Sequence, residues 1–294
     1  MRHRTITVVA VLVCLVAVAA GCEPFKDSVP EGKAPLRYRD AVFTSVTKTE
    51  DVTYGSAPAF DGSGDVALKL DVYQPKGDTA TGRPLLVFVH GGGFASLDKT
   101  SGEIVDQANV FAKKGYVVAA IDYRLDDVGC SKVAPACITA IKGAQHDAQA
   151  AVRYLRKRHV GYRIDQNRIA IGGSSAGAIT ATNVAFAGSD VGTSGSPGTS
   201  SKVAAAVSLS GAAITTRPDK GESPVLFFHG TKDTLVPYVW MSNTRADAEK
   251  AGVHTELTTW DGGGHVPYVE HRTQILDQTT NFLYHELDLS HAGA

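Results

Sequence analysis

The chain has 294 residues, of which 43% are hydrophobic and 20% are charged, which is enough for one domain of about 250 residues with a hydrophobic core. The formal net charge is −1, without a basic stripe or an acidic tail, so charge indicates no nucleic acid or other macromolecular partner. The ten histidines lack metal-ligand spacing, and we expect neither a metal nor a cofactor.

The first 21 residues have the features of a secretory signal peptide. A basic start is followed by an apolar stretch at 6–20 that is too short to span a membrane permanently. The stretch ends in Ala19-Ala20-Gly21-Cys22, which resembles a bacterial lipobox with alanine in place of the usual leucine at position 19. We expect Cys22 to be acylated and to hold the exported protein at a membrane surface as a lipoprotein. The alternative is ordinary cleavage after Ala19, which would leave a secreted protein.

Residues 22–39 are polar, contain three prolines and are predicted to form a mobile lipoprotein tether. The catalytic domain is expected at 40–294. It begins with two strands, at 41–47 and 66–73, of which the second alternates apolar and polar residues and pairs with the first.

Strands and helices alternate along the rest of the chain. Further strands are predicted at 85–89, 116–121, 169–171, 203–209, 225–228 and 254–260, and helices at 104–112, 141–155, 179–184, 238–251 and 275–283. This alternation is typical of a mainly parallel sheet with helices on both faces. The segment 186–202 is rich in glycine, serine and threonine and is expected to be a flexible loop.

One turn between a strand and a helix contains the pattern Gly-x-Ser-x-Gly, with Ser175 at its centre. Gly173 and Gly177 would leave room for a serine in a strained backbone conformation that exposes its hydroxyl, a nucleophile elbow. The next N–H, on Ala176, lies at a helix N-terminus, where unpaired donors favour an anion. The pattern alone is weak evidence in a chain with 30 glycines, so other motifs must support it.

Two further motifs stand in the required order around this elbow. A His-Gly-Gly-Gly-Phe run occupies 90–94 after a buried strand, and Asp233 and His265 follow later strands. With these motifs the sequence resembles the α/β-hydrolase superfamily, and within it the carboxylesterases and hormone-sensitive-lipase-like esterases. The resemblance implies an α/β-hydrolase fold with a mainly parallel eight-stranded sheet. It also implies that 90–94 is the oxyanion loop, Asp233 the acid and His265 the base.

The chemistry of acyl transfer explains these residue types. Ser175 is a poor nucleophile by itself, so His265 must take its proton during the attack and return a proton to the leaving alcohol. Asp233 would hold the imidazole in the correct tautomer. Negative charge that develops on the carbonyl oxygen needs preplaced hydrogen-bond donors. The candidate donors are the backbone N–H groups of Gly92 or Gly93 and of Ala176.

Other residues near the motifs have simpler expected roles. Asp261 is closer to His265 in the sequence, but it precedes a glycine turn and is expected to cap that turn rather than to act as the triad acid. His90 is expected to shape the oxyanion loop, and His229 to be an ordinary polar residue. Large side chains beside the motif loops are candidates for the wall of a substrate pocket. They are Phe94, Val236, Trp240, Val266 and Tyr268.

Cys130 and Cys137 remain as a pair once Cys14 and Cys22 are assigned to the signal and the lipobox. In an oxidising compartment we expect them to form a disulfide. Two free buried thiols are the alternative.

The connection between the strands that end near 210 and begin at 225 is too short for the lid that the family often inserts. We therefore expect no large cap domain unless the 186–202 loop folds over the site. The predicted function is hydrolysis of carboxylic esters through an acyl-enzyme, with short to medium acyl chains and an open site for bulky alcohols or polymer-borne esters. The alternatives are a serine peptidase and a catalytically inactive binding module on the same scaffold.

Overall fold

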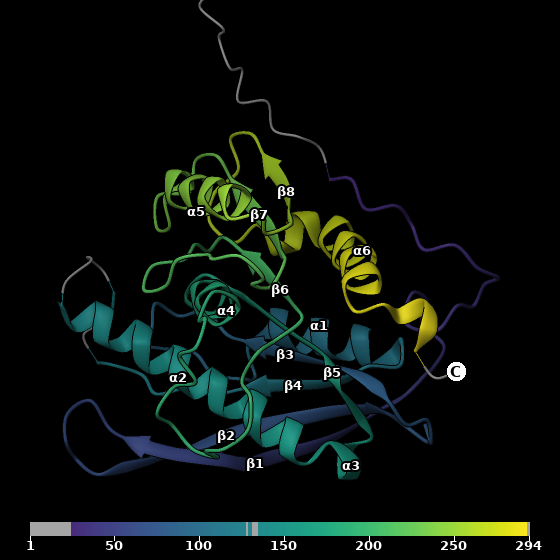
Figure 1. Ribbon diagram of the computed structural model, residues 1–294, viewed down its shortest axis with the longest axis horizontal. Coiled ribbons are helices and arrows are strands. Elements are labelled where there is room, and N and C mark those ends of the chain that lie inside the picture. The colour runs from purple at the N-terminus through teal and green to yellow at the C-terminus, as the bar shows by residue number, and fades with distance from the viewer. Residues whose placement is uncertain (1–24, 128, 131–134, 293–294) are drawn as a thin grey trace, which may run out of the picture.

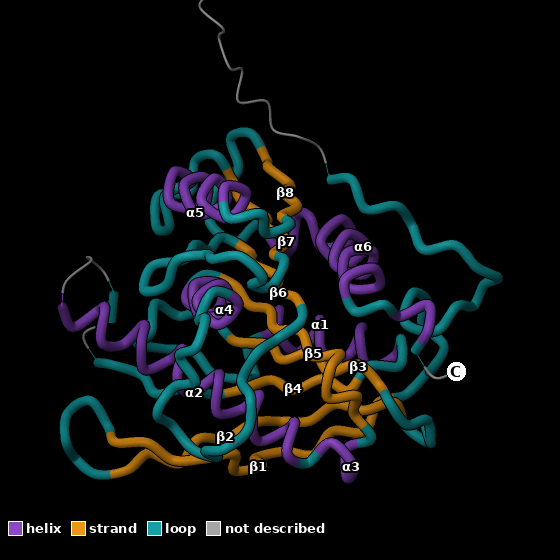
Figure 2. The backbone as a smooth tube through the Cα atoms, in the orientation of Figure 1, coloured by secondary structure: helices purple, strands orange, loops and turns teal. Residues whose placement is uncertain are grey.

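The computed structural model describes residues 25–127, 129–130 and 135–292. The signal peptide expected at 1–21 and the lipidation site expected at Cys22 lie outside these residues. One eight-stranded sheet runs through the domain, and helices cover both of its faces (Figures 1 and 2).

The sheet has the strand order β1-β2-β4-β3-β5-β6-β7-β8. Its strands are β1 Val46–Pro58, β2 Asp65–Pro75, β3 Arg83–Val89, β4 Val117–Ile121, β5 Ile164–Ser174, β6 Ala205–Leu209, β7 Val225–Gly230 and β8 Thr255–Trp260. β2 is antiparallel to both β1 and β4, whereas every pair from β4 to β8 is parallel. The mainly parallel eight-stranded sheet predicted from the sequence is therefore confirmed.

The helices bury apolar residues of the two sheet faces in separate layers. They are α1 Gly102–Lys113, α2 Pro135–Lys157, α3 His159–Tyr162, α4 Ala176–Ala185, α5 Tyr238–Lys250, α6 Tyr268–Glu286 and the short 3-10 helix η1 Leu289–His291. α2, α4 and α5 pack on one face, and α1 and α6 pack on the other (Figure 1). All seven residues of β3 are buried, as expected for a central strand covered on both sides.

The first strand differs from the prediction. We expected it at 41–47, but β1 spans Val46–Pro58. β1 is an edge strand whose side chains are mostly exposed, so its sequence lacks the apolar alternation that reveals a half-buried strand.

The last residues of the expected tether belong to the folded domain. The ring of Tyr38 is buried and packs edge-to-face on Tyr116, with 5.5 Å between the ring centroids. The N–H of Tyr38 donates to the carbonyl of Lys114 at 2.8 Å, and Arg37 forms an ion pair with Asp78. The boundary expected at residue 40 is therefore too late. Figure 1 shows the N-terminal segment passing beside α6, where the Ser28 carbonyl lies 3.0 Å from Nε2 of His285.

The 186–202 loop is fastened to α2, which corrects the expectation of a flexible loop. The guanidinium of Arg153 donates to the backbone carbonyls of Val191, Ser194 and Ser196. Arg153 is 1% exposed, so these bonds are shielded from water. Asp147 adds a hydrogen bond from the Ser194 hydroxyl at 2.5 Å. The local composition of the loop does not reveal this order, because the order depends on one buried arginine some 40 residues earlier in the chain.

The connection from β6 to β7 contains no helix or strand. This agrees with the expectation that no large cap is inserted there. In the part of the chain that the structure describes, no helix is both long and apolar enough to span a membrane.

Candidate active site

Ser175 stands at the sharp turn between β5 and α4. Its backbone has φ 53° and ψ −119°, a strained conformation for a residue with a side chain. The turn exists because the chain approaches β3 closely at two glycines. A Cβ on Gly177 would lie 2.0 Å from the carbonyl oxygen of Val89, and one on Gly173 would lie 2.6 Å from the same oxygen. The N–H of Ser175 donates to the Leu209 carbonyl at 2.9 Å and fixes the turn to β6.

Three side chains that are far apart in the sequence form one hydrogen-bonded chain at the carboxyl edge of the sheet. The Ser175 Oγ lies 2.8 Å from Nε2 of His265. Nδ1 of His265 lies 2.7 Å from Oδ2 of Asp233. This geometry fits a hydroxyl that donates to Nε2 and an Nδ1–H that donates to the carboxylate. The structure therefore brings together the serine, acid and histidine that the motifs predict.

Asp233 is held in place by four donors. Its Oδ1 accepts hydrogen bonds from the N–H groups of Leu235 and Val236, each at 2.9 Å. Its Oδ2 faces His265 and also Nε2 of His229 at 3.3 Å. Burial raises the pKa of Asp233, but the hydrogen bonds from His229 and His265 lower it by more, so the net pKa lies well below the usual value. The carboxyl is therefore ionised and suited to orient an imidazole.

His229 and Asp261 lie near the triad but do not contact Ser175, and each has its own hydrogen-bond partner. His229, which we expected to be an ordinary polar residue, is fully buried, and its Nε2 lies 2.8 Å from the Val236 carbonyl. Asp261 accepts a hydrogen bond from the Thr231 hydroxyl at 3.0 Å. That hydroxyl in turn accepts from the N–H of Gly262, so Asp261 takes part in a turn network.

The 90–94 loop lies directly above the serine turn. A Cβ on Gly91 would be 3.4 Å from the Cβ of Ser175. Gly92 and Gly93 have φ values of +97° and +62°, and a Cβ on Gly92 would lie 2.0 Å from the Ser96 carbonyl oxygen. Glycine is therefore required at position 92, because the backbone has a positive φ and because a Cβ would overlap the Ser96 carbonyl.

The side chains beneath this loop hold its shape. Nδ1 of His90 lies 2.8 Å from the Gly91 carbonyl, and the His90 ring stacks on Tyr123 with 4.3 Å between centroids. The Tyr123 hydroxyl donates to the same carbonyl at 2.9 Å. Burial lowers the pKa of His90, which favours its neutral form.

The expected oxyanion donors border one cavity together with Ser175. Gly92, Gly93 and Ala176 all line it. Among the described residues, none of their N–H groups has a hydrogen-bond acceptor. Ala176 is the first residue of α4, where a free N–H is expected. The three groups are therefore available to a ligand atom near the serine.

The cavity has a volume of about 890 Å³ and a mainly apolar wall. Four of the five predicted wall residues line it, namely Phe94, Val236, Trp240 and Val266. Tyr268 does not, because its ring is buried on the α1 side of the sheet and its hydroxyl donates to Oδ2 of Asp106 at 2.6 Å. The wall also contains apolar residues that no motif marked. They are Leu97, Ile141, Ile179, Ile214 and Leu235.

Cys130 and Cys137 form a disulfide that borders the same cavity. The bond that the cysteine count predicted is therefore present. It joins the loop after β4 to the first turn of α2, and Ile141 of the same helix lines the cavity as well.

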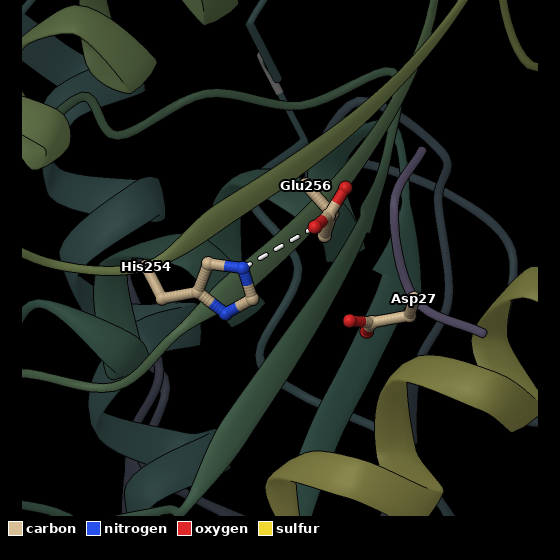
Figure 3. Close-up of side chains that lie close together, drawn as sticks. All are labelled: Asp27, His254 and Glu256. Carbon is tan, nitrogen blue, oxygen red and sulfur yellow. Dashed lines mark hydrogen bonds and ion pairs between the residues drawn. The ribbon is translucent and has the colours of Figure 1, made fainter. Parts of the chain in front are cut away.

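One cluster of described residues could hold a metal ion. The ligand atoms of Asp27, His254 and Glu256 lie within 4.8 Å of one another (Figure 3). However, both ring nitrogens of His254 already face carboxylates, with Nδ1 2.6 Å from Glu286 and Nε2 3.3 Å from Glu256. The hydrogen bond to Glu286 is the main cause that raises the pKa of His254 to about 9. His254 thus forms ion pairs that join the start of β8 to α6.

The fold and the serine–histidine–aspartate geometry define an α/β-hydrolase. The chain belongs to the BD-FAE family, because the model of that family matches residues 70–217, half of the chain. Residues 203–286 match a second family model, that of TAP-like protein. The two matches share residues 203–217 and together extend from β2 to the end of α6.

Three curated proteins are similar to part of the chain. The non-reducing polyketide synthase atr1 of Stereocaulon alpinum is 30% identical over 135 residues, which are 44% of this chain and 5% of the synthase. Gut esterase 1 of Caenorhabditis elegans is 29% identical over 122 residues, 42% of this chain and 21% of that protein. Fumonisin B1 esterase of Sphingopyxis macrogoltabida is 30% identical over 124 residues, 40% of this chain and 22% of that protein. The chain thus spans less than a quarter of the length of each.

Solved structures of esterase 2 from Thermogutta terrifontis share the fold over most of both chains. The form phosphoramylated by tabun has a TM-score of 0.67 and 24% identity and covers 80% of this chain and 94% of that one. The propionate-bound form has a TM-score of 0.62 and 25% identity, with 82% and 93% covered.

Proposed function

We propose that the protein is a carboxylesterase that cleaves its substrate through an acyl-enzyme on Ser175. The observation that carries this proposal is the position of His265, with one ring nitrogen 2.8 Å from the Ser175 hydroxyl and the other 2.7 Å from Asp233. These distances fit a general base that is already oriented toward its nucleophile. The esterases among the similar proteins support the same class of reaction.

In the first half-reaction, the Ser175 oxygen attacks the ester carbonyl carbon while its proton moves to Nε2 of His265. The tetrahedral intermediate collapses when the bond to the alcohol oxygen breaks and that oxygen takes the proton from Nε2. In the second half-reaction, water attacks the acyl carbonyl carbon while one of its protons moves to Nε2 of His265. The bond to the Ser175 oxygen then breaks, that oxygen takes the proton from Nε2, and the carboxylic acid leaves. Asp233 stabilises the imidazolium in both halves.

The negative oxygen of each intermediate would accept hydrogen bonds from the N–H groups of Ala176 and of Gly92 or Gly93. These groups line the cavity at the serine and have no acceptor among the described residues. One such preorganised donor typically contributes roughly 10²–10³ in rate.

The preferred substrates are esters of short to medium acyl chains with a bulky or polymer-borne alcohol. The cavity of about 890 Å³ has room for more than a small acyl group, and the short β6–β7 connection adds no cap above it. The propionate-bound structure of the similar esterase supports a short acyl group.

The experiment that tests this function compares ester and amide substrates. Purified protein should hydrolyse p-nitrophenyl butyrate, with activity lost in Ser175→Ala. Aminoacyl p-nitroanilides of similar size should be cleaved far more slowly. Faster cleavage of the anilides would favour a serine peptidase, and no turnover by folded protein would favour a binding module.

We also propose that the protein is exported and anchored to a membrane surface through acylated Cys22. The Cys130–Cys137 disulfide supports an oxidising compartment. Expression in bacteria fed an alkyne fatty acid should label the wild-type chain and not Cys22→Ala. Release of unlabelled wild-type protein into the medium would instead indicate ordinary cleavage and secretion.

A further inference from the structure

The 90–94 loop, which carries the expected oxyanion donors, is bound to the loop after β4. The N–H of Cys130 donates to the Gly93 carbonyl at 3.0 Å, and the N–H of Asp126 donates to the Phe94 carbonyl at 2.8 Å. Two consecutive carbonyls of the 90–94 loop therefore have donors from the same short stretch of chain. The reaction described above gives these two hydrogen bonds no role.

Gly93 depends on these contacts more than the glycine before it does. A Cβ on Gly92 would overlap the Ser96 carbonyl, whereas a Cβ on Gly93 would meet no atom within 4 Å. Gly93 has a φ of +62°, and glycine adopts either sign of φ with similar ease. Close packing therefore restrains Gly92, but hydrogen bonds must fix the conformation of Gly93.

The peptide units on the two sides of Gly93 are held by different partners. The unit before it contains the Gly92 carbonyl and the Gly93 N–H, and that carbonyl accepts from the N–H groups of Ala95 and Ser96, each at 3.1 Å. Because C=O and N–H point in opposite directions in a trans peptide, the Gly93 N–H points away from these two donors. The unit after it is held through the Gly93 carbonyl by the N–H of Cys130. Both backbone dihedral angles of Gly93 thus lie between anchored units.

Cys130 is in turn fixed to α2 by the disulfide. Its partner Cys137 lies in the first turn of α2, is 2% exposed and belongs to the hydrophobic core. Gly129, the residue before Cys130, also packs closely on the donor loop. A Cβ on Gly129 would lie 2.8 Å from the Cβ of Ala95 and 3.1 Å from the carbonyl oxygen of Gly93. The disulfide therefore links a buried helix to backbone that contacts the donor loop directly.

We propose that the Cys130–Cys137 disulfide positions an oxyanion donor: it fixes Cys130 to α2, and Cys130 holds Gly93 in the conformation that presents its N–H to the carbonyl oxygen of the substrate. The inference rests on the proposed esterase function. Negative charge develops on that oxygen only during the reaction, so a donor held in place lowers the barrier more than it strengthens substrate binding. A disulfide otherwise acts mainly on the unfolded chain, and that effect alone leaves kcat of the folded enzyme unchanged.

The test measures kcat and KM for p-nitrophenyl butyrate, and the inhibition constant of butylboronic acid, in wild type and in the double variant Cys130→Ala, Cys137→Ala. In the inhibitor complex, the Ser175 oxygen bonds to boron, its proton moves to His265, and a boronate oxygen takes the place of the negative oxygen of the intermediate. Complete removal of one donor typically costs roughly 10²–10³ in rate, so a loosened Gly93 should lower kcat about tenfold or more with little change in KM. The inhibition constant should rise by about the same factor.

Two further measurements separate the position of the donor from the loss of the cysteine side chains. Gly129→Ala keeps both cysteines, but its Cβ would push the backbone away from Gly93, so it should lower kcat and boronate affinity in the same way. Dithiothreitol, which is oxidised to a cyclic disulfide as it reduces the protein disulfide to two thiols, should do so in the wild type, and reoxidation should restore both values. Gly252→Ala is the matched control, because Gly252 has a φ of +76° and a Cβ there would meet no atom within 4 Å. It should have wild-type kinetics.

A folded double variant with the wild-type kcat and boronate inhibition constant would overturn the inference. A higher KM at unchanged kcat would also overturn it, since the disulfide would then only shape the cavity wall. A lower kcat with unchanged boronate affinity would do the same, because the effect would then lie outside the oxyanion donors. If the double variant does not fold, Gly129→Ala and the reduced wild type decide by the same criteria. A folded wild type that hydrolyses no ester would instead reject the esterase function on which the inference rests.

Discussion

Oδ2 of Asp233 lies 3.3 Å from Nε2 of His229, and both side chains are completely buried. Because the same oxygen faces His265 and Oδ1 accepts two backbone hydrogen bonds, the carboxylate has one orientation and a low pKa. This arrangement explains why the more distant Asp233, rather than the sequence neighbour Asp261, serves the imidazole.

Asp233→Asn should lower kcat by roughly 10⁴, because an amide favours the wrong tautomer of His265. Asp261→Asn is the matched control and should change kcat little, since Asp261 binds the Thr231 hydroxyl. Steady-state kinetics with p-nitrophenyl butyrate measure both. A large loss in Asp261→Asn with near-normal Asp233→Asn would show that the acid is assigned wrongly.

The proposed preference for short to medium acyl chains predicts a limited rise of kcat/KM with chain length. Each buried methylene contributes about 0.8 kcal/mol, or roughly a fourfold change in kcat/KM, only while apolar wall remains to cover it. Values measured from C2 to C16 esters should therefore rise to about C4–C6 and then stop rising. A maximum at C12 or longer would contradict the open site.

The loop at 186–202 should have no influence on that preference, because it lines no part of the cavity and is bound to α2 through Arg153. Arg153→Met should make the loop sensitive to limited proteolysis while the chain-length profile stays unchanged. Lys157→Met, an exposed position on the same helix, is the control for loss of charge. A changed profile in folded Arg153→Met would mean that the loop does reach the substrate.

The cluster at His254 predicts a pH-dependent stability. The folded-state pKa of about 9 lies above the ordinary 6.5, so the stabilisation is fully present below about pH 6.5 and is lost as the pH rises through 9. Because His254 is about half exposed, we expect its contribution to be on the order of 1 kcal/mol. Urea unfolding of wild type and His254→Gln should differ most at pH 6 and converge by pH 10. His291→Gln, at an exposed site, is the control, and a pH-independent difference for His254→Gln would reject the account.

The Cys130–Cys137 bond closes a short loop and should raise the free energy of unfolding by about 2–3 kcal/mol in the chain-entropy model. Urea unfolding of the double serine variant measures this difference. Mass spectrometry of exported protein alkylated without reductant provides the second readout. Alkylation of both cysteines would show that the bond is not formed in the cell.

The sequence predicted the parts of the site that local motifs encode. The elbow and the glycine loop depend on steric demands within a few residues, and the order of strands fixes where Asp233 and His265 must lie. The cavity wall could not be predicted in the same way. Ile141 and Ile179 reach it from separate helices. Tyr268 follows His265 closely in the sequence, yet its side chain packs on the face of the sheet that α1 covers.

The missed elements share a dependence on distant contacts. β1 is an exposed edge strand, and only its pairing with β2 identifies it. The 186–202 loop looks flexible by composition, but one buried arginine supplies its carbonyl partners. The hydrogen bonds from Asp126 and Cys130 to the 90–94 loop belong to no motif, since they join the loops that follow β3 and β4.

The most direct test of the account is the site at which a fluorophosphonate reacts. Ser175 has the His265 imidazole within hydrogen-bond distance and free N–H donors at its cavity, so intact-protein mass spectrometry should show one adduct per chain, and peptide mapping should place it on Ser175. Ser175→Ala should carry no adduct. Folded wild-type protein that remains unlabelled, or an adduct on another residue, would contradict the proposal that Ser175 is the nucleophile.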